Sequence, residues 1–189
     1  MEIIEDQIFE KENYTQKPLL QAEYENCRFV DCDFSNAVLN GIRFLECTFT
    51  GCNLSSASIV NTAFIDVSFT GSKMLGLHFE TCNQFGLALA FNSSVLNHSS
   101  FYQTKLKKTV FKDCKLVEVE FTEADLSSAV FSDCDLSGAG FENTNLEKTD
   151  FRTAGHYTID LEKNKCKKAR FSQAGLPGLL TKYNIVITP

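Results

Sequence analysis

The chain has 189 residues, with eighteen Lys and Arg against twenty-four Asp and Glu, which gives a formal net charge of −6. This length suits one domain, and the negative charge argues against bare nucleic acid or an anionic membrane as the main partner. The first ten residues lack the basic region of a secretory signal, and no apolar run reaches the roughly 18 residues of a membrane span. We therefore expect a soluble, cytoplasmic protein.

Apolar residues recur at every fifth position along most of the chain. One series runs through residues 9–79, the spacing then slips by two, and a second series runs through residues 91–151. Further centres of the same pattern fall at Leu161, Phe171 and Leu176. Sixteen of the seventeen Phe occupy these centres, and Phe85, inside the slip, is the exception. The repeat is therefore the main structural signal in the sequence.

The position two residues before most centres holds a small side chain. Such residues are Ala22, Cys27, Cys32, Ala37, Cys47, Cys52, Ala57, Thr104, Thr109, Cys114, Ala124, Ala129, Cys134 and Ala139. Both positions are expected to face inward, while the other three places hold mostly polar and turn-forming residues. A helix would scatter these centres around its axis, and a continuous strand would alternate them between faces. The chain is therefore expected to turn once in every five residues.

A longer period of twenty residues indicates how many pentads close one coil. Identical residues twenty apart form the series Phe91, Phe111, Phe131, Phe151 and Phe171. Four pentads per coil would stack this series into a ladder. The alternation of Phe and Leu by itself would fit any even number of pentads per coil. With about 4.8 Å per coil, roughly eight coils would form a rod about 38 Å long with a packed bore.

Four segments carry a family resemblance. They read CDFSN at residues 32–36, CNLSS at 52–56, ADLSS at 124–128 and CDLSG at 134–138. These segments resemble the A(D/N)LxX signature of pentapeptide-repeat proteins. The resemblance implies an all-β fold, a right-handed quadrilateral β-helix of about eight coils with Phe or Leu in the bore.

The repeat pattern predicts one pentapeptide-repeat domain over residues 1–189. Residues 1–20 are expected to form an N-terminal cap or the first coil. Residues 80–90 contain the register slip. Residues 177–189 depart from the repeat and are expected to form a C-terminal cap.

The cysteines and histidines give no sign of a catalytic or metal site. Seven of the eight Cys fall two places before a centre, and Cys166 falls at a centre, so buried reduced thiols are expected. We expect His78 and His98 at the surface, and His156 in place of a core residue in the irregular stretch 152–170. The chain is predicted not to be an enzyme, with no catalytic residues, no cofactor and no metal.

The last residues are apolar without following the repeat, and they predict a helical turn and a strand closing the last coil. Better-known members of the family join two rods at this end, which implies a homodimer. Its interface would contain Leu179, Leu180, Tyr183, Ile185 and Ile187. The alternative is a cap folded on its own chain.

The resemblance extends to the Qnr-like quinolone-resistance group, which implies a DNA mimic that binds DNA gyrase or topoisomerase IV and protects against quinolone-type inhibitors. Residues 116–150 sum to a charge of −8 over less than two coils, a local density comparable with duplex DNA. The candidate acidic surface consists of Glu118, Glu120, Glu123, Asp125 and Glu142. Phe85 is a further candidate, either exposed for a partner or acting as the staple of a bulge.

A general interaction or structural rod with an unknown partner is the alternative function. Residues twenty apart should be lateral neighbours, so opposite charges could neutralise one another without any partner. The expected pairs are Glu23/Arg43, Lys105/Asp125, Lys115/Asp135, Glu147/Lys167 and Asp150/Arg170.

Overall fold

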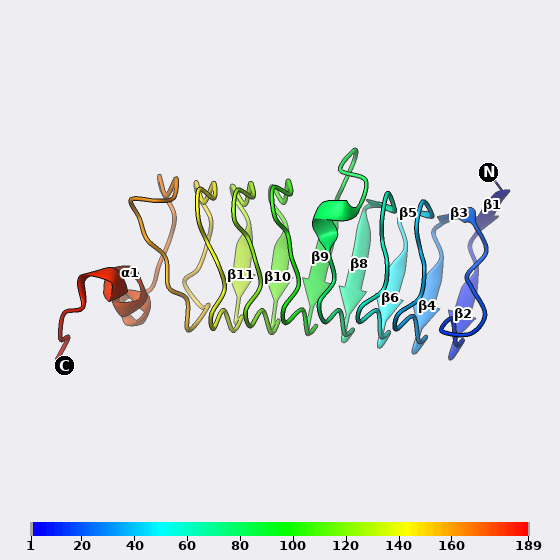
Figure 1. The fold of residues 1–189 in the computed structure, drawn as a ribbon, viewed down its shortest axis with the longest axis horizontal. Coiled ribbons are helices and arrows are strands. Elements are labelled where there is room, and N and C mark those ends of the chain that lie inside the picture. The colour runs from blue at the N-terminus through cyan, green and yellow to red at the C-terminus, as the bar shows by residue number, and fades with distance from the viewer. Residues whose placement is uncertain (1, 189) are drawn as a thin grey trace.

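The computed structural model describes residues 2–188, which wind into a parallel β-solenoid shaped as a rod (Figure 1). One sheet contains β1 (Glu2–Glu5), β3 (Ala22–Glu25), β5 (Arg43–Leu45) and β7 (Ala63–Ile65). The second sheet contains, in spatial order, β11 (Val130–Ser132), β10 (Val110–Lys112), β9 (Leu89–Asn92), β8 (Val67–Thr70), β6 (Thr48–Thr50), β4 (Arg28–Val30) and β2 (Ile8–Glu10). All of these strand pairs are parallel, and β1 and α1 (Pro177–Leu180) lie at opposite ends of the rod (Figure 1).

Neighbouring coils are in register at a spacing of twenty residues, so four pentads form each coil as expected. Phe29 pairs with Phe49, and across the slip Phe69 pairs with Phe91. The seven strands of the larger sheet mark seven turns, close to the eight expected. We name the four faces of the rod after four successive centres near the N-terminus: the Phe9, Tyr14, Leu19 and Tyr24 faces.

The bore is filled by stacked aromatic rings. Along the Phe9 face, ring centroids are 5.1 Å apart between Phe91 and Phe111, and 4.8 Å apart between Phe111 and Phe131. The same stack continues at 5.0 Å to Phe151 and at 5.4 Å to Phe171, with rings within 8° of parallel over this series. The predicted Phe ladder is therefore confirmed.

The chain turns at a left-handed residue two places after most centres. Asp31 has φ 52°, Lys108 has φ 62° and Glu118 has φ 54°. Asn, Asp and Gly adopt this conformation more readily than other residues. Lys and Glu pay about 1–2 kcal/mol for it, so the packed coil must hold these corners in place.

The small residues before the centres are buried, as predicted. All fourteen residues of that set are buried, and the eight Cys are free thiols. The thiols of Cys47 and Cys52 donate to the carbonyl oxygens of Tyr24 at 3.2 Å and Phe29 at 3.3 Å. Burial raises the pKa of both thiols to about 12, so they stay protonated and unreactive near neutral pH.

Three predicted core positions near the C-terminal end are wrong. Leu161 and Leu176 are exposed, and so is the side chain of His156. His156 adopts the left-handed conformation, with φ 60°, although the repeat predicts a core centre at this position. The turn there places Tyr157 and Ile159 in the core instead. The regular register returns at the bridge between Asn145 and Lys165.

The slip forms a short projection that lies between β8 and β9 in chain order (Figure 1). A 3-10 helix, Phe79–Thr81, precedes it, and Leu89 pairs with Val67 where the strands resume. The two extra residues are accommodated on the Tyr24 face alone, because the ring stack of the Phe9 face continues from Phe69 to Phe91 at 5.5 Å.

The C-terminal segment is helical, without the predicted strand. It contains the 3-10 helix Gln173–Gly175, α1 and the 3-10 helix Thr181–Tyr183, and the predicted helical turn is thus confirmed. Asn184, with φ 47°, ends the last helix, and residues 185–188 form no strand. The four residues of α1 make the longest helix described, so none of the described helices could cross a membrane.

The ring stack predicts a large effect of one core substitution. Phe111→Ala removes a fully buried ring that stacks on Phe91 and Phe131, and should lower the free energy of unfolding by about 3–5 kcal/mol in urea titrations. Val110→Ala is the matched control on the same strand, because Val110 is 43% exposed. It should cost about 1 kcal/mol or less. Equal losses for the two variants would contradict the packed bore.

Candidate protein-binding surfaces

The predicted acidic residues share one region of the rod. Glu118, Glu120, Glu123 and Glu142 belong to the Leu19 face or its corners, as shown by the bridges from Glu120 to Ser100 and Gly140. The backbone N–H of Glu123 donates to the carbonyl of Glu142 at 2.8 Å, so these two residues are neighbours. Asp125 lies on the adjacent Tyr24 face, where it bridges to Lys105 and Asn145.

Basic side chains lie beside three of these five carboxylates. Glu118 Oε2 lies 3.2 Å from His98 Nδ1, and Glu142 Oε1 lies 2.9 Å from Lys163 Nζ. Asp125 Oδ2 lies 3.8 Å from Lys107 Nζ. Glu120 and Glu123 form no ion pair with the described residues; Glu123 accepts a hydrogen bond from the Gln103 amide at 2.7 Å. The predicted set is therefore a mixed surface of both charges.

A second acidic row lies at the corner between the Tyr24 and Phe9 faces. It consists of Glu5, Asp6, Glu25, Glu46 and Asp66, and we call it the corner row. A hollow of about 300 Å³ is lined by four of its residues together with Asn26. Within residues 2–188, none of the five carboxylates has an ion-pair partner closer than 4.0 Å. The corner row is thus the clearest unneutralised carboxylate series.

Sequence reasoning missed the corner row because it summed charge along the chain. Asp6, Asn26, Glu46 and Asp66 are twenty residues apart and share the left-handed corner conformation. The same period that identified the ring ladders, applied to the second position after each centre, would have predicted these carboxylates as neighbours.

Two of the five expected lateral ion pairs form. Glu23 and Arg43 lie 2.6 Å apart, and Arg170 lies 3.7 Å from Asp150. The remaining three are wrong as contacts, although the register behind them holds. Asp125 pairs with Lys107 instead of Lys105, and Asp135 pairs with His156 instead of Lys115. Glu147 has no ion pair among the described residues, although its coil keeps the expected register. Exposed Lys side chains gain little from one fixed partner in water.

Phe85 is presented to solvent by a hydrogen-bonded loop. Its side chain is 87% exposed, so the staple interpretation is wrong and the exposed alternative holds. The Asn83 side chain accepts from the Phe85 N–H at 2.9 Å, and the Gln84 amide donates to the carbonyls of Phe79 and Cys82. These bonds fix the loop and leave the ring without a packing partner in the described chain.

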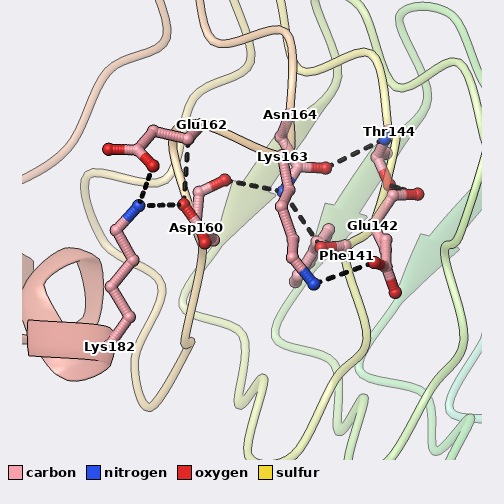
Figure 2. Close-up of polar contacts among 8 residues, drawn as sticks. All are labelled: Phe141, Glu142, Thr144, Asp160, Glu162, Lys163, Asn164 and Lys182. Atoms are coloured by element: carbon pink, nitrogen blue, oxygen red, sulfur yellow. Dashed lines mark hydrogen bonds and ion pairs between the residues drawn. The ribbon is translucent and has the colours of Figure 1, made fainter.

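The C-terminal cap is clamped to the last coil by Lys182. Its Nζ lies 2.7 Å from Asp160 Oδ1 and 2.8 Å from Glu162 Oε2 (Figure 2). The hydrogen bond from Lys182 is the main cause that lowers the pKa of both carboxyls, and it raises the pKa of Lys182. Tyr183 adds a hydrogen bond to Glu162 at 3.2 Å.

The same coil is tied to its neighbour by the buried Asn164. Its amide donates to the carbonyls of Phe141 and Asp160, both at 2.9 Å, and its side-chain oxygen accepts from the Thr144 N–H at 2.9 Å (Figure 2). Asn164 therefore joins the last coil to the coil before it.

The predicted dimer residues divide into buried and exposed groups. Leu179 is buried on its own chain and Leu180 is half-buried, so neither is free for a large contact. Tyr183, Ile185 and Ile187 are 53%, 56% and 52% exposed.

The histidines lie apart, each beside a single carboxylate. His78, His98 and His156 pair with Glu80, Glu118 and Asp135. In the described part of the chain, no three His, Cys, Asp or Glu side chains gather as metal ligands.

The register, the ring ladders and the repeated corners define a four-sided β-solenoid built from five-residue units. Residues 27–64 match the family of pentapeptide repeats (8 copies), and residues 77–151 match the pentapeptide repeat region. The chain belongs to the pentapeptide-repeat family. No curated protein matches its sequence.

Several solved structures are similar to the chain. A trypsin-treated form of QnrB1, a plasmid-mediated fluoroquinolone resistance protein, is 19% identical with a TM-score of 0.49, covering 98% of this chain and 100% of that one. HetL, involved in heterocyst differentiation regulation in the cyanobacterium Nostoc sp. strain PCC 7120, is 20% identical with a TM-score of 0.43, covering 88% and 86%. Identity of 20% or less assigns no function to this chain.

Acid should release the cap. Because Asp160 and Glu162 have lowered pKa values in the folded protein, their contribution is present above the ordinary carboxyl pKa of about 4 and is lost as the pH falls through the lowered values. Amide protection factors of residues 177–183 should fall near pH 3 before those of the coils. Lys182→Ala should lower them already at pH 7, whereas Lys168→Ala should not. Equal protection of the cap at both pH values would refute the clamp.

Proposed function

We propose that this chain is a non-catalytic binding protein that mimics DNA on the DNA-binding surface of DNA gyrase or topoisomerase IV and protects the enzyme against quinolone-type inhibitors. The observation that carries this proposal is the corner row. From Asp6 to Asp66 it spans three coil steps, about 14 Å, with five carboxylates. One strand of duplex DNA presents about four phosphates over that length.

The electrostatics of the rod suit a basic, DNA-binding partner rather than DNA itself. A net charge of −6 repels phosphates, while unneutralised carboxylates can replace them against Lys and Arg side chains. The five sequence-predicted residues, Glu118, Glu120, Glu123, Asp125 and Glu142, form a second and weaker acidic surface on the Leu19 and Tyr24 faces. We place this activity in the cytoplasm, where eight free thiols remain reduced.

Phe85 is assigned to the same interface as an apolar anchor. An exposed aromatic ring on a fixed loop buries a large area at little entropic cost when it enters a partner's pocket. A general interaction rod with another partner is the alternative, and the exposed ring of Phe85 fits that function as well.

Self-association in which the C-terminal end of one copy contacts a second copy is a further part of the proposal. Tyr183, Ile185 and Ile187 supply its exposed apolar surface, while Leu179 and Leu180 support it from beneath.

Neutralising the corner row should abolish protection of gyrase. In a cleavage assay with ciprofloxacin, the unmodified chain should reduce the cleaved DNA. The triple variant Glu5→Gln, Glu25→Gln, Glu46→Gln should require at least about tenfold more protein for the same effect. The matched control, Glu118→Gln, Glu120→Gln, Glu123→Gln, removes the same charge elsewhere and should lose less. If micromolar unmodified protein neither protects nor inhibits gyrase and does not bind it, the interaction rod is the correct function.

Phe85→Ala should weaken binding to gyrase by about tenfold or more without changing stability. The ring is 87% exposed, so its removal should alter the free energy of unfolding by less than about 0.5 kcal/mol. Val38→Ala, at another exposed apolar position, is the control and should leave the binding constant unchanged. Titration of labelled protein with gyrase measures both. Unchanged affinity in the Phe85 variant would remove the ring from the interface.

A further inference from the structure

The N-terminal end of the rod carries two strand edges without partners. β1 and β2 each have a sheet neighbour on one side only, and no segment within residues 2–188 covers their outer edges. A hollow of about 390 Å³ opens at this end, with Phe9 and Tyr14 among its lining residues. Ile8, on β2, is 61% exposed. An open edge beside an apolar hollow can accept an added strand.

The opposite end of the rod carries a short segment suited to become that strand. Ile185, Val186 and Ile187 are 56%, 90% and 52% exposed and belong to no strand. β-branched residues favour extended structure. Three residues are also the length of β2, Ile8–Glu10. The segment, which we call the tail, leaves the cap and points away from the coils (Figure 1).

The two ends carry opposite charges. Residues 2–26 contain seven Asp and Glu and two Lys, whereas residues 160–188 contain six Lys and Arg and two acidic residues, Asp160 and Glu162. Contact between two C-terminal ends would bring like charges together. Contact between a C-terminal end and an N-terminal end would bring opposite charges together, so electrostatics select this second arrangement.

We propose that the tail of one copy adds a strand to the outer edge of β2 in a second copy. Phe9 is the inward residue of β2, between two outward neighbours, Ile8 and Glu10. Val186 takes the corresponding place in the tail and packs over Phe9 in the hollow. Lys165, Lys167 and Lys168, which have no ion-pair partner among the described residues, then approach the carboxylates of the first coil.

This contact joins two different surfaces, so it does not close on itself. A head-to-tail interface of this kind produces open chains unless a rotation closes a ring. The assembly should therefore grow with protein concentration beyond the dimer. Raising the salt concentration should weaken it by about tenfold or more, because the opposed charges are exposed.

Sedimentation velocity of the full chain and two variants tests the proposal. Val186→Asp blocks the tail, and Ile8→Lys blocks the receiving edge; both positions are exposed, so both variants should fold. Each variant alone should be monomeric. Their equimolar mixture should form dimers and nothing larger, because one intact tail and one intact edge remain. Val110→Asp, an acidic substitution at a 43% exposed position on β10, away from both ends of the rod, should assemble like the unmodified chain.

Other outcomes overturn the proposal. Dimers that persist in Ile8→Lys and vanish in Val186→Asp would show contact between two C-terminal ends. Dimers that persist in Val186→Asp alone would show contact between two N-terminal ends. Monomers of the unmodified chain at high concentration and low salt would exclude self-association through either end.

Discussion

The structure depends on the fit between the spacing of parallel coils and the distance between the centroids of stacked aromatic rings. The backbone ladder repeats at about 4.8 Å, and rings such as Phe111 and Phe131 stack at 4.8 Å without displacing the coils. The place two residues before most bulky centres holds a small side chain such as Ala or Cys, although Ile42, Val67, Leu77 and Val119 are also buried at this place. The left-handed corner then follows, because the chain must turn before the next bulky side chain.

This internal order leaves the outward side chains free to vary. Three of every five residues point toward solvent or form the corners, and their neighbours are determined by the twenty-residue register. The corner row arises in this way from residues far apart in sequence, such as Asp6 and Asp66. The opposite charges of the two ends arise differently, since a solenoid places the first and last segments of the chain at opposite ends of the rod.

The repeat made the core and the register predictable from sequence. Identical residues twenty apart were enough to predict the Phe ladder, and the slip before Phe91 was located. The prediction of core residues failed at His156, where a single backbone angle changes the pattern. The repeat does not indicate where the chain will turn before the expected corner. The prediction also failed for ion pairs such as Lys115 with Asp135, since lateral proximity does not select one rotamer of a solvated side chain.

The projection that carries Phe85 shows what the scaffold tolerates. Two additional residues enter between Asn83 and Leu89, yet the ring stack passes beneath them from Phe69 to Phe91 without a break. At this point of the rod, one face can therefore gain residues without interrupting the stacked rings of the core. A designer could graft a longer peptide there and display it at a fixed height, because the coils above and below are already locked to each other.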